Sequence, residues 1–304
     1  MAGAAAAGLA AAVSEAGGLG MIGANPRKGP DWLRRQIRSV RERTRRPFGV
    51  GLITSAPHLD ELLRVTIEEG VPSVSHSFAD PTPYVAAAHD AGITVLAQVQ
   101  KVSHAGKAAR AGVDIIAAQG TGAGGHTGYS ATLSLVPAVI DVAGDIPVVA
   151  AGGIADGRGL AAVLLLGAEG AWLGTRFVAS HEAITADWKK EGLIQSGTDD
   201  TILTRTYDII GNAPFPRDIS NRVLRNDFTD WWHGRDEDIA ARRDELMEQV
   251  ETAEQHEDAG IAQIHAGNAT GLISQVEPAA SIVRRIIEEA EAILRDRPQE
   301  LLRE

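Results

Sequence analysis

Residues 94–118 read TVLAQVQKVSHAGKAARAGVDIIAA, and this stretch holds one complete strand–helix–strand unit. The apolar run Thr94–Val99 predicts a buried strand, and Val102–Ala111 has the alanine-rich, amphipathic pattern of a helix. Gly112 then supplies the left-handed cap that turns the chain back into a second strand, Asp114–Ala118. Because strands joined through a crossover helix run parallel, the unit predicts a parallel α/β sheet.

The same unit repeats on both sides of this stretch. Helical segments end in a glycine step before the next strand, as at Gly70, Gly92 and Gly167. The strands are nearly continuous apolar runs, which is typical of a sheet covered on both faces. We therefore predict an α/β fold with a parallel sheet, either closed as a TIM barrel or open and doubly wound. The seven predicted strands are Leu19–Gly23, Phe48–Ile53, Ser73–Ser77, Thr94–Val99, Asp114–Ala118, Pro147–Ala151 and Gly170–Leu173.

A closed TIM (β/α)8 barrel has eight strands, one more than this pattern shows. The missing strand is the first, because the chain passes from Met1-Ala2-Gly3 directly into the helical segment Ala4–Ala16. Two explanations remain open: the sequence begins inside the natural gene product, or the barrel is open between its first and last strands. An open barrel exposes two unpaired strand edges, so we expect aggregation or a homodimer formed through the gap.

After Phe177 the strand–helix rhythm stops. Residues 185–260 are polar and charged with a helical pattern, which predicts a small helical insertion after the last strand. This insertion either only packs on the barrel or forms a lid that shapes the substrate pocket. Residues 278–296 return to an amphipathic pattern and would supply the last barrel helix. The predicted domains are a barrel made of residues 1–184 and 261–304, and the insertion as a lid subdomain.

Composition excludes several kinds of function. The 304 residues carry a formal net charge of −11, which argues against nucleic acid as a partner. The chain has no cysteine, so disulfides, thiolate metal sites and cysteine nucleophiles are excluded, and a cytoplasmic location is expected. No run of about 18 apolar residues occurs, so we expect no membrane span. The histidines show no metal-ligand spacing, and we predict no metal site.

The segment that follows the strand Asp114–Ala118 is rich in glycine. Its residues from Gly120 to Gly125 match the G-x-G-x-x-G pattern of dinucleotide-binding folds, but that pattern should open directly into the helix of the first βαβ unit. Here a polar loop follows, and we reject the match. The loop instead carries His126 at the carboxyl end of a strand, where barrels place reactive groups, so His126 is the candidate catalytic residue. Backbone without side chains at Gly124 and Gly125 lets a flat ring approach closely.

Two further glycine segments belong to the same end of the predicted barrel. Gly152-Gly153 follows one strand, and Gly174-Thr175 follows the next. Glycine leaves backbone N–H groups free to bind phosphate, and barrels commonly place a phosphate site at these last two strand ends. The two segments together therefore predict a phosphate site. His76, at another strand end, either faces the same pocket or, as we expect, has a core or surface role.

These segments, in this order, resemble those of the nitronate monooxygenase family, formerly called 2-nitropropane dioxygenases. The resemblance runs from Met1-Ala2-Gly3 through Gly120–Gly128 and Pro147–Ala179 to Ala266–Ile273, which is essentially the whole chain apart from the insertion. It implies a TIM barrel that binds FMN non-covalently. By this resemblance, the phosphate is held by Gly152, Gly153, Gly174 and Thr175, the flavin ring lies along Met1, Ala2, Gln98 and Gln119, and the active-site histidine is His126.

The resemblance also implies a reaction. The expected substrates are O2 and an alkyl nitronate such as propionate 3-nitronate, and the expected products are nitrite and a carbonyl compound, with the flavin carrying the redox steps. His126 would hold the nitronate oxygens or remove the α-proton of a neutral nitroalkane. Two alternatives stay open: a related FMN enzyme that uses NAD(P)H to reduce a quinone or an enoyl thioester, and a non-catalytic flavin-binding protein inactivated by loss of the first strand.

Overall fold

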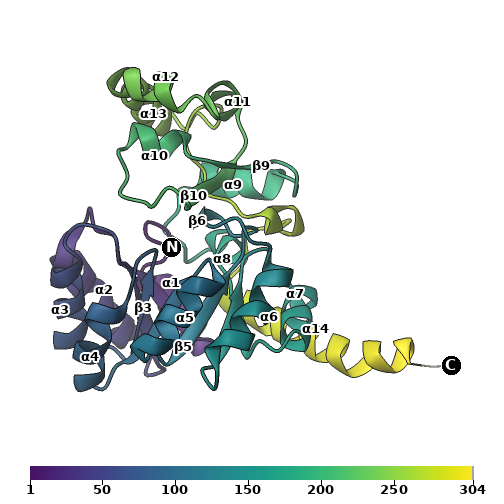
Figure 1. Cartoon of the computed structure of the whole chain (residues 1–304). Coiled ribbons are helices and arrows are strands. Elements are labelled where there is room, and N and C mark those ends of the chain that lie inside the picture. Colours follow the sequence, from purple (N-terminus) through teal and green to yellow (C-terminus); the bar gives the residue numbers. More distant parts are fainter. Residues whose placement is uncertain (303–304) are drawn as a thin grey trace.

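The computed structural model describes residues 1–302 and shows a parallel seven-stranded sheet curved into a half-barrel (Figure 1). The strand order β1-β2-β3-β4-β5-β7-β8 means that each new strand is added beside the previous one. All seven strands were predicted, with ends that differ by at most one residue. Their bounds are β1 Gly20–Gly23, β2 Phe48–Ile53, β3 Ser73–Ser77, β4 Thr94–Val99, β5 Ile115–Gln119, β7 Val148–Ala151 and β8 Gly170–Trp172.

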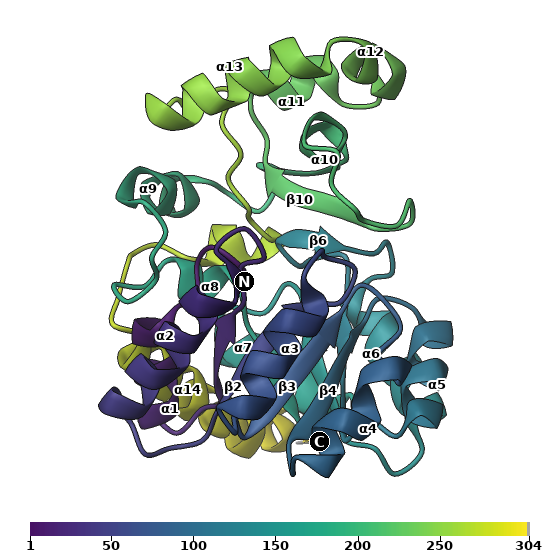
Figure 2. The same cartoon turned by 90° about the vertical axis from the view of Figure 1, so that its left-hand side faces the viewer.

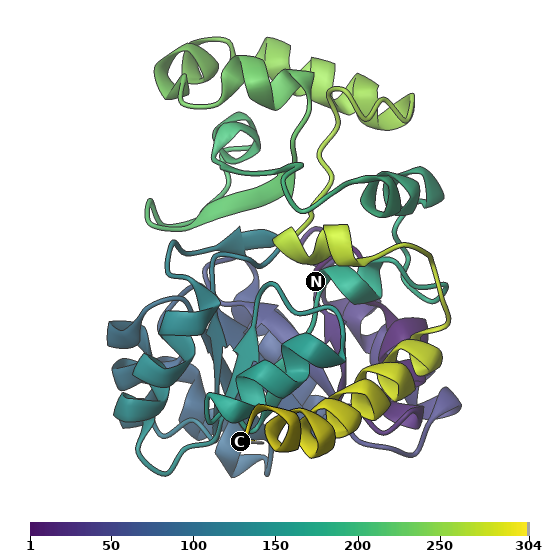
Figure 3. The same ribbon diagram turned by 90° about the vertical axis from the view of Figure 1, so that its right-hand side faces the viewer.

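Helices connect consecutive strands and cover the outer face of this sheet (Figures 2 and 3). The long helix near the carboxyl terminus packs beside α7 and α1, so it takes the place of the last barrel helix, as the pattern of residues 278–296 predicted. The bounds of the outer helices are α1 Ala7–Glu15, α2 Gly29–Arg43, α3 Leu59–Glu68, α4 Thr82–Asp90, α5 Val102–Ala111, α6 Thr132–Ala143, α7 Gly157–Leu165 and α14 Ala279–Leu301.

The barrel is open between β1 and β8, because these two strands are the edges of the sheet. Within residues 1–302, no strand lies between them, which confirms the predicted gap. Helix α1 nevertheless packs directly on β1. A Cβ on Gly20 would overlap the backbone of Ala10, so glycine is needed for this close approach of helix and strand.

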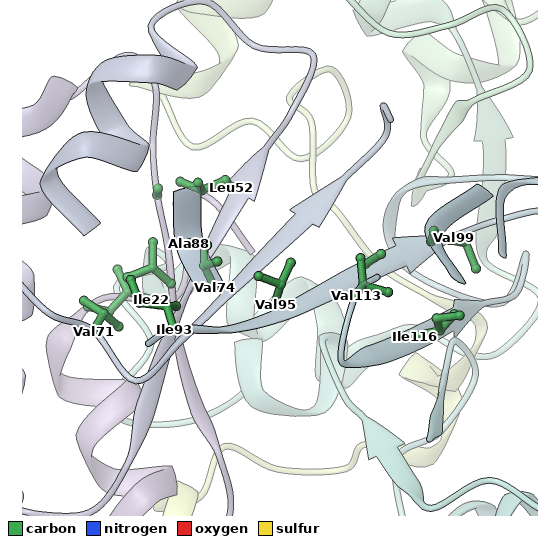
Figure 4. Packing of buried hydrophobic residues seen from close by; sticks show 14 of the residues in the cluster. Ile22, Leu52, Val71, Val74, Ala88, Ile93, Val95, Val99, Val113 and Ile116 are labelled. Carbon is green, nitrogen blue, oxygen red and sulfur yellow. The ribbon is translucent and has the colours of Figure 1, made fainter. Parts of the chain in front are cut away.

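The register of the strands decides which side chains face the barrel interior. Gln98 of β4 lies opposite Ser77 of β3 and Ala117 of β5. Side chains opposite one another in neighbouring strands share a face, and successive residues alternate between the two faces. Val74 of β3 packs with Ala88 in the apolar cluster between the sheet and its helices, so its side chain faces outward (Figure 4). Residues that alternate with Val74 along the strand, such as Ser77, therefore face the barrel interior, and so does Gln98 opposite Ser77. Gln98 is thus an interior residue near the carboxyl end of its strand.

The insertion stands over the carboxyl ends of the barrel strands (Figure 1) and is not helical throughout. Strands β9 (Thr201–Thr204) and β10 (Ser220–Leu224) form an antiparallel sheet with β6 (Gly125–Thr127), in the order β6-β10-β9. The sequence pattern predicted only helices in the insertion and only a loop at β6, because strands this short show no period of their own. The remaining helices are α8 Thr175–Val178, α9 Asp187–Gln195, α10 Thr206–Ile210, α11 Asp227–Trp232, α12 Asp236–Ala241, α13 Arg243–Gln255 and the 3₁₀ helix η1 Asn268–Leu272.

Candidate functional site

Two glutamines predicted for the site lie at the carboxyl ends of adjacent strands. Gln98 is the fifth residue of β4, and Gln119 is the last residue of β5. Gln119 is buried, and its Oε1 accepts a 2.9 Å hydrogen bond from Nε2 of Gln100. Gln100, which was not predicted as a site residue, therefore fixes the orientation of the Gln119 amide. This bond leaves Nε2 of Gln119 as the donor that a ligand can use.

The predicted glycine segments meet backbone to backbone at the same edge of the barrel. A Cβ on Gly124 would lie 2.5 Å from the backbone N of Gly267 and 2.9 Å from Oγ1 of Thr175. A Cβ on Gly152, whose φ is +100°, would lie 2.6 Å from the carbonyl oxygen of Gly120. The backbone N–H of Gly267 also donates a 3.0 Å hydrogen bond to Oγ1 of Thr175. We call this arrangement, formed by residues 120–125, 152–153, 174–175 and 266–267, the glycine cradle.

Met1 and Ala2 lie between the ends of the two edge strands. The backbone of Met1 abuts Gly23, the last residue of β1, closely enough that a Cβ on this glycine would overlap the Met1 carbonyl. On the other side, Sδ of Met1 lies 3.6 Å from where a Cβ on Gly174 would stand. Gly153, with a φ of +78°, has open space at its Cβ position. The structure therefore brings the predicted ring-lining residues Met1 and Ala2 next to the glycine cradle.

His126 is the middle residue of β6, which begins at Gly125 with a φ of +74°. Its Nε2 lies 2.8 Å from Oδ1 of Asp208 on α10. Phe215 stacks on the imidazole, with ring centroids 3.4 Å apart and planes 15° apart, and Phe78 meets the ring edge-on. An ionised carboxylate only accepts hydrogen bonds, so Nε2 carries the hydrogen and Nδ1 keeps its lone pair. His126 is thus held in one tautomer, with Nδ1 available as a base.

A second imidazole lies beside the first. Asn221 pairs with His126 across β10 and β6, and Val223, two residues further along β10, pairs with His265. The two histidines therefore share one face of the small sheet, with ring centroids 6.4 Å apart. Oδ1 of Asn221 lies 3.0 Å from Nδ1 of His265. Desolvation by burial is the main cause that lowers the pKa of His265, so this ring is neutral at pH 7.

Sequence reasoning missed Asp208, Phe215, Asn221 and His265 as site residues. Asp208, Phe215 and Asn221 lie in the insertion, and all four come close to His126 through contacts between segments far apart in the chain. None of them follows a barrel strand or belongs to a glycine-rich segment. The one available signal was that His265 directly precedes Ala266–Ile273, which resembles a family segment.

His76 lies outside this site. It stacks on Tyr84 of α4 with ring centroids 5.3 Å apart, and its Nδ1 lies 3.2 Å from Oγ1 of Thr54. Burial lowers the pKa of His76 to about 4, so it is a neutral core residue, as expected. Across residues 1–302, no group of three or more His, Cys, Asp or Glu side chains is placed to hold a metal ion. Over the same range, no helix has both the length and the apolar character needed to cross a membrane.

A curved parallel sheet whose helices cover its outer face, with a glycine cradle and a histidine at the carboxyl ends of its strands, defines a protein of the TIM-barrel class. The chain belongs to the nitronate monooxygenase family, since the family model described as "Nitronate monooxygenase" matches residues 1–289. This family is flavin-dependent.

Two curated relatives and one solved structure show the range of similar proteins. The chain is 38% identical over 224 residues, 73% of its length, to (3aS,4S,5R,7aS)-5-hydroxy-7a-methyl-1-oxo-octahydro-1H-indene-4-carboxyl-CoA dehydrogenase of Mycobacterium tuberculosis, and it spans only 60% of that relative's length. It is 35% identical to a nitronate monooxygenase of Neurospora crassa, over 93% of this chain and 85% of the relative. FabK from Thermotoga maritima, 36% identical, matches with a TM-score of 0.89 over 99% of this chain and 93% of that chain.

Proposed function

We propose that this protein is an FMN-dependent nitronate monooxygenase, which oxidises an alkyl nitronate such as propionate 3-nitronate with O2 to a carbonyl compound and nitrite. The family and the relative from Neurospora crassa support this reaction. The observation that carries the proposal is the pair of His126 and Asp208, 2.8 Å apart, at the end of the barrel that also holds the glycine cradle. When bound, FMN supplies the electron transfer between substrate and O2.

The glycine cradle fits a phosphate and a flat ring. Gly152 and Gly153 both have positive φ, and backbone in such conformations can form a concave set of N–H groups that binds an anion. The absence of Cβ atoms lets the ligand approach this backbone closely. We assign the phosphate to Gly152, Gly153, Gly174 and Thr175, and the flavin ring to Met1, Ala2, Gln98, Gln119, Gly124 and Gly125.

The purified protein is expected to carry FMN, because the glycine segments form one phosphate site. Cofactor released by heat should run as FMN on chromatography, whereas FAD would contradict the assignment. Riboflavin, which lacks the phosphate, is a matched control. It should bind the apoprotein about 10-fold or more weakly than FMN, since charge-assisted hydrogen bonds contribute roughly 1.5–3 kcal/mol. Equal affinity for riboflavin and FMN would show that the cradle does not bind phosphate.

The side chains around His126 explain how it acts on the substrate. A preformed nitronate would be bound by the imidazolium form of His126, in which Nδ1–H donates to a nitronate oxygen while Nε2–H donates to Asp208. A neutral nitroalkane would lose its α-proton to Nδ1, and the carboxylate of Asp208 would stabilise the imidazolium that forms. Phe215 and Phe78 pack on the ring of His126 and limit the access of water to it.

Asp208 acts through His126 as a positioning residue. Asp208→Asn is expected to lower kcat for a neutral nitroalkane about 10-fold, because an asparagine amide can donate to Nε2 and so favours the wrong tautomer. The KM should change little, and the pH profile of kcat should shift because the imidazolium loses its counter-charge. Asp208→Glu, which keeps the carboxylate, should restore part of the activity. An unchanged kcat and pH profile in Asp208→Asn would contradict this role.

A second candidate function is the oxidation or reduction of an acyl thioester with a nicotinamide cofactor. The observation that favours it is the 38% identity to a relative named as a carboxyl-CoA dehydrogenase. Nitrite release from a nitronate without NAD(P)H would support the monooxygenase. Anaerobic bleaching of the flavin by NAD(P)H, with turnover of a quinone or an enoyl thioester and no nitrite from nitronate, would support the second function instead.

A further inference from the structure

One ring nitrogen of His265 is left without a partner. Its Nδ1–H donates to Oδ1 of Asn221, so Nε2 keeps the lone pair of the neutral ring. In the part of the chain that the structure describes, no protein group forms a hydrogen bond with this Nε2. The side chain is exposed, yet desolvation lowers its pKa. Because the residue is exposed, a ligand can reach this nitrogen.

Backbone pairing fixes His265 on the same face as His126. The N–H of Leu224 donates to the carbonyl of Ile264 at 2.8 Å, and the N–H of Ala266 donates to the carbonyl of Arg222 at 3.3 Å. These two bonds on either side of His265 continue the edge of β10 that pairs with His126. With ring centroids 6.4 Å apart, a small ligand that touches one imidazole lies within reach of the other.

We propose that His265 is a second substrate-contacting residue, whose Nε2 accepts a hydrogen bond from a hydroxyl group next to the reacting carbon of the substrate. This inference rests on the proposed function, and it narrows the alkyl nitronates of the same site to those that carry a hydroxyl group, which propionate 3-nitronate lacks. A neutral imidazole with a free lone pair binds a donor and not an anion, so it adds nothing to recognition of the nitronate charge. It selects hydroxylated nitro compounds, because an acceptor left unpaired by an analogue without the hydroxyl weakens binding.

2-Nitroethanol and 1-nitropropane test the inference, since they differ only by a hydroxyl in place of a methyl group. Binding of both is measured under anaerobic conditions from the absorbance shift of the oxidised flavin, read before any bleaching of the flavin by the ligand. The wild-type protein is expected to bind 2-nitroethanol about 10-fold or more tightly. His265→Leu should abolish this preference. His265→Gln, which keeps an acceptor oxygen, should retain part of it, and His256→Leu, at an exposed histidine that follows α13, should leave it unchanged.

Each result of these binding measurements either supports or overturns the role of His265. Equal affinity for the two ligands, no binding of either, or a preference that survives in His265→Leu overturns the role of His265. A preference lost in His265→Leu and kept in His256→Leu supports it. Nitrite release is measured separately: a hydroxyl preference without nitrite would reject the proposed monooxygenase reaction and leave the assignment of His265 standing.

Discussion

Replacing His126 by alanine is expected to lower turnover of a neutral nitroalkane by about 10²–10⁴-fold, the usual range for the loss of a general base. Nδ1 is the ring nitrogen free to take the α-proton, because Nε2 is bound to Asp208. FMN content should change little, since the imidazole is not part of the glycine cradle. Nitrite release at saturating nitroalkane, corrected for the flavin content of each preparation, measures the effect.

Preformed nitronate is the matched control for this variant, because its α-proton has already been removed. If His126 is the base, His126→Ala should lose much less activity on nitronate than on the parent nitroalkane. Equal losses on both substrates would contradict the assignment of His126 as a base and leave it only a binding role. His256→Ala, at a histidine that follows α13, should behave as the wild type on both substrates.

The barrel could be predicted closely because its strands are covered on both faces. Phe48–Ile53 and Thr94–Val99 are nearly continuous apolar runs, and the structure gives both strands the predicted bounds. The open edge between β1 and β8 was predicted from the count of seven strands, since no apolar run precedes the first helical segment. The predicted glycine segments also come together, because the carboxyl ends of parallel strands meet at one edge of the barrel.

The partners of His126 could not be predicted in the same way. β9 and β10 have only four and five residues, and their pairing with β6 depends on a glycine loop far upstream in the chain. Asp208 lies on a five-residue helix, too short for a hydrophobic period to show which face it presents. His265 owes its place to two backbone hydrogen bonds with β10. Such tertiary contacts leave no local pattern, so the sequence indicated an insertion, either a packing subdomain or a lid, but not the side chains that it brings to His126.

Gly124→Val is expected to weaken FMN binding by about 100-fold. A Cβ at this position would lie 2.5 Å from the backbone N of Gly267, which is closer than such contacts occur in proteins. The segment around Gly267 must then move away, which breaks its 3.0 Å hydrogen bond to Thr175, a residue that we propose binds the phosphate. Overpacking of this kind costs about 1–3 kcal/mol, and each 1.4 kcal/mol is about a factor of ten in affinity.

The expected loss of FMN affinity comes from a steric clash and not from backbone strain, and two further variants separate these causes. The φ of Gly124 is not positive, so alanine is tolerated by the backbone, and Gly124→Ala should weaken FMN about 10-fold, less than valine does. Gly170→Ala in β8 is the control, because its Cβ would lie 3.8 Å from the nearest atom, an ordinary contact. It should keep the wild-type dissociation constant for FMN, measured by fluorescence titration of apoprotein. Wild-type affinity in Gly124→Val would mean that the closed contact between residues 124 and 267 is not needed to hold the cofactor.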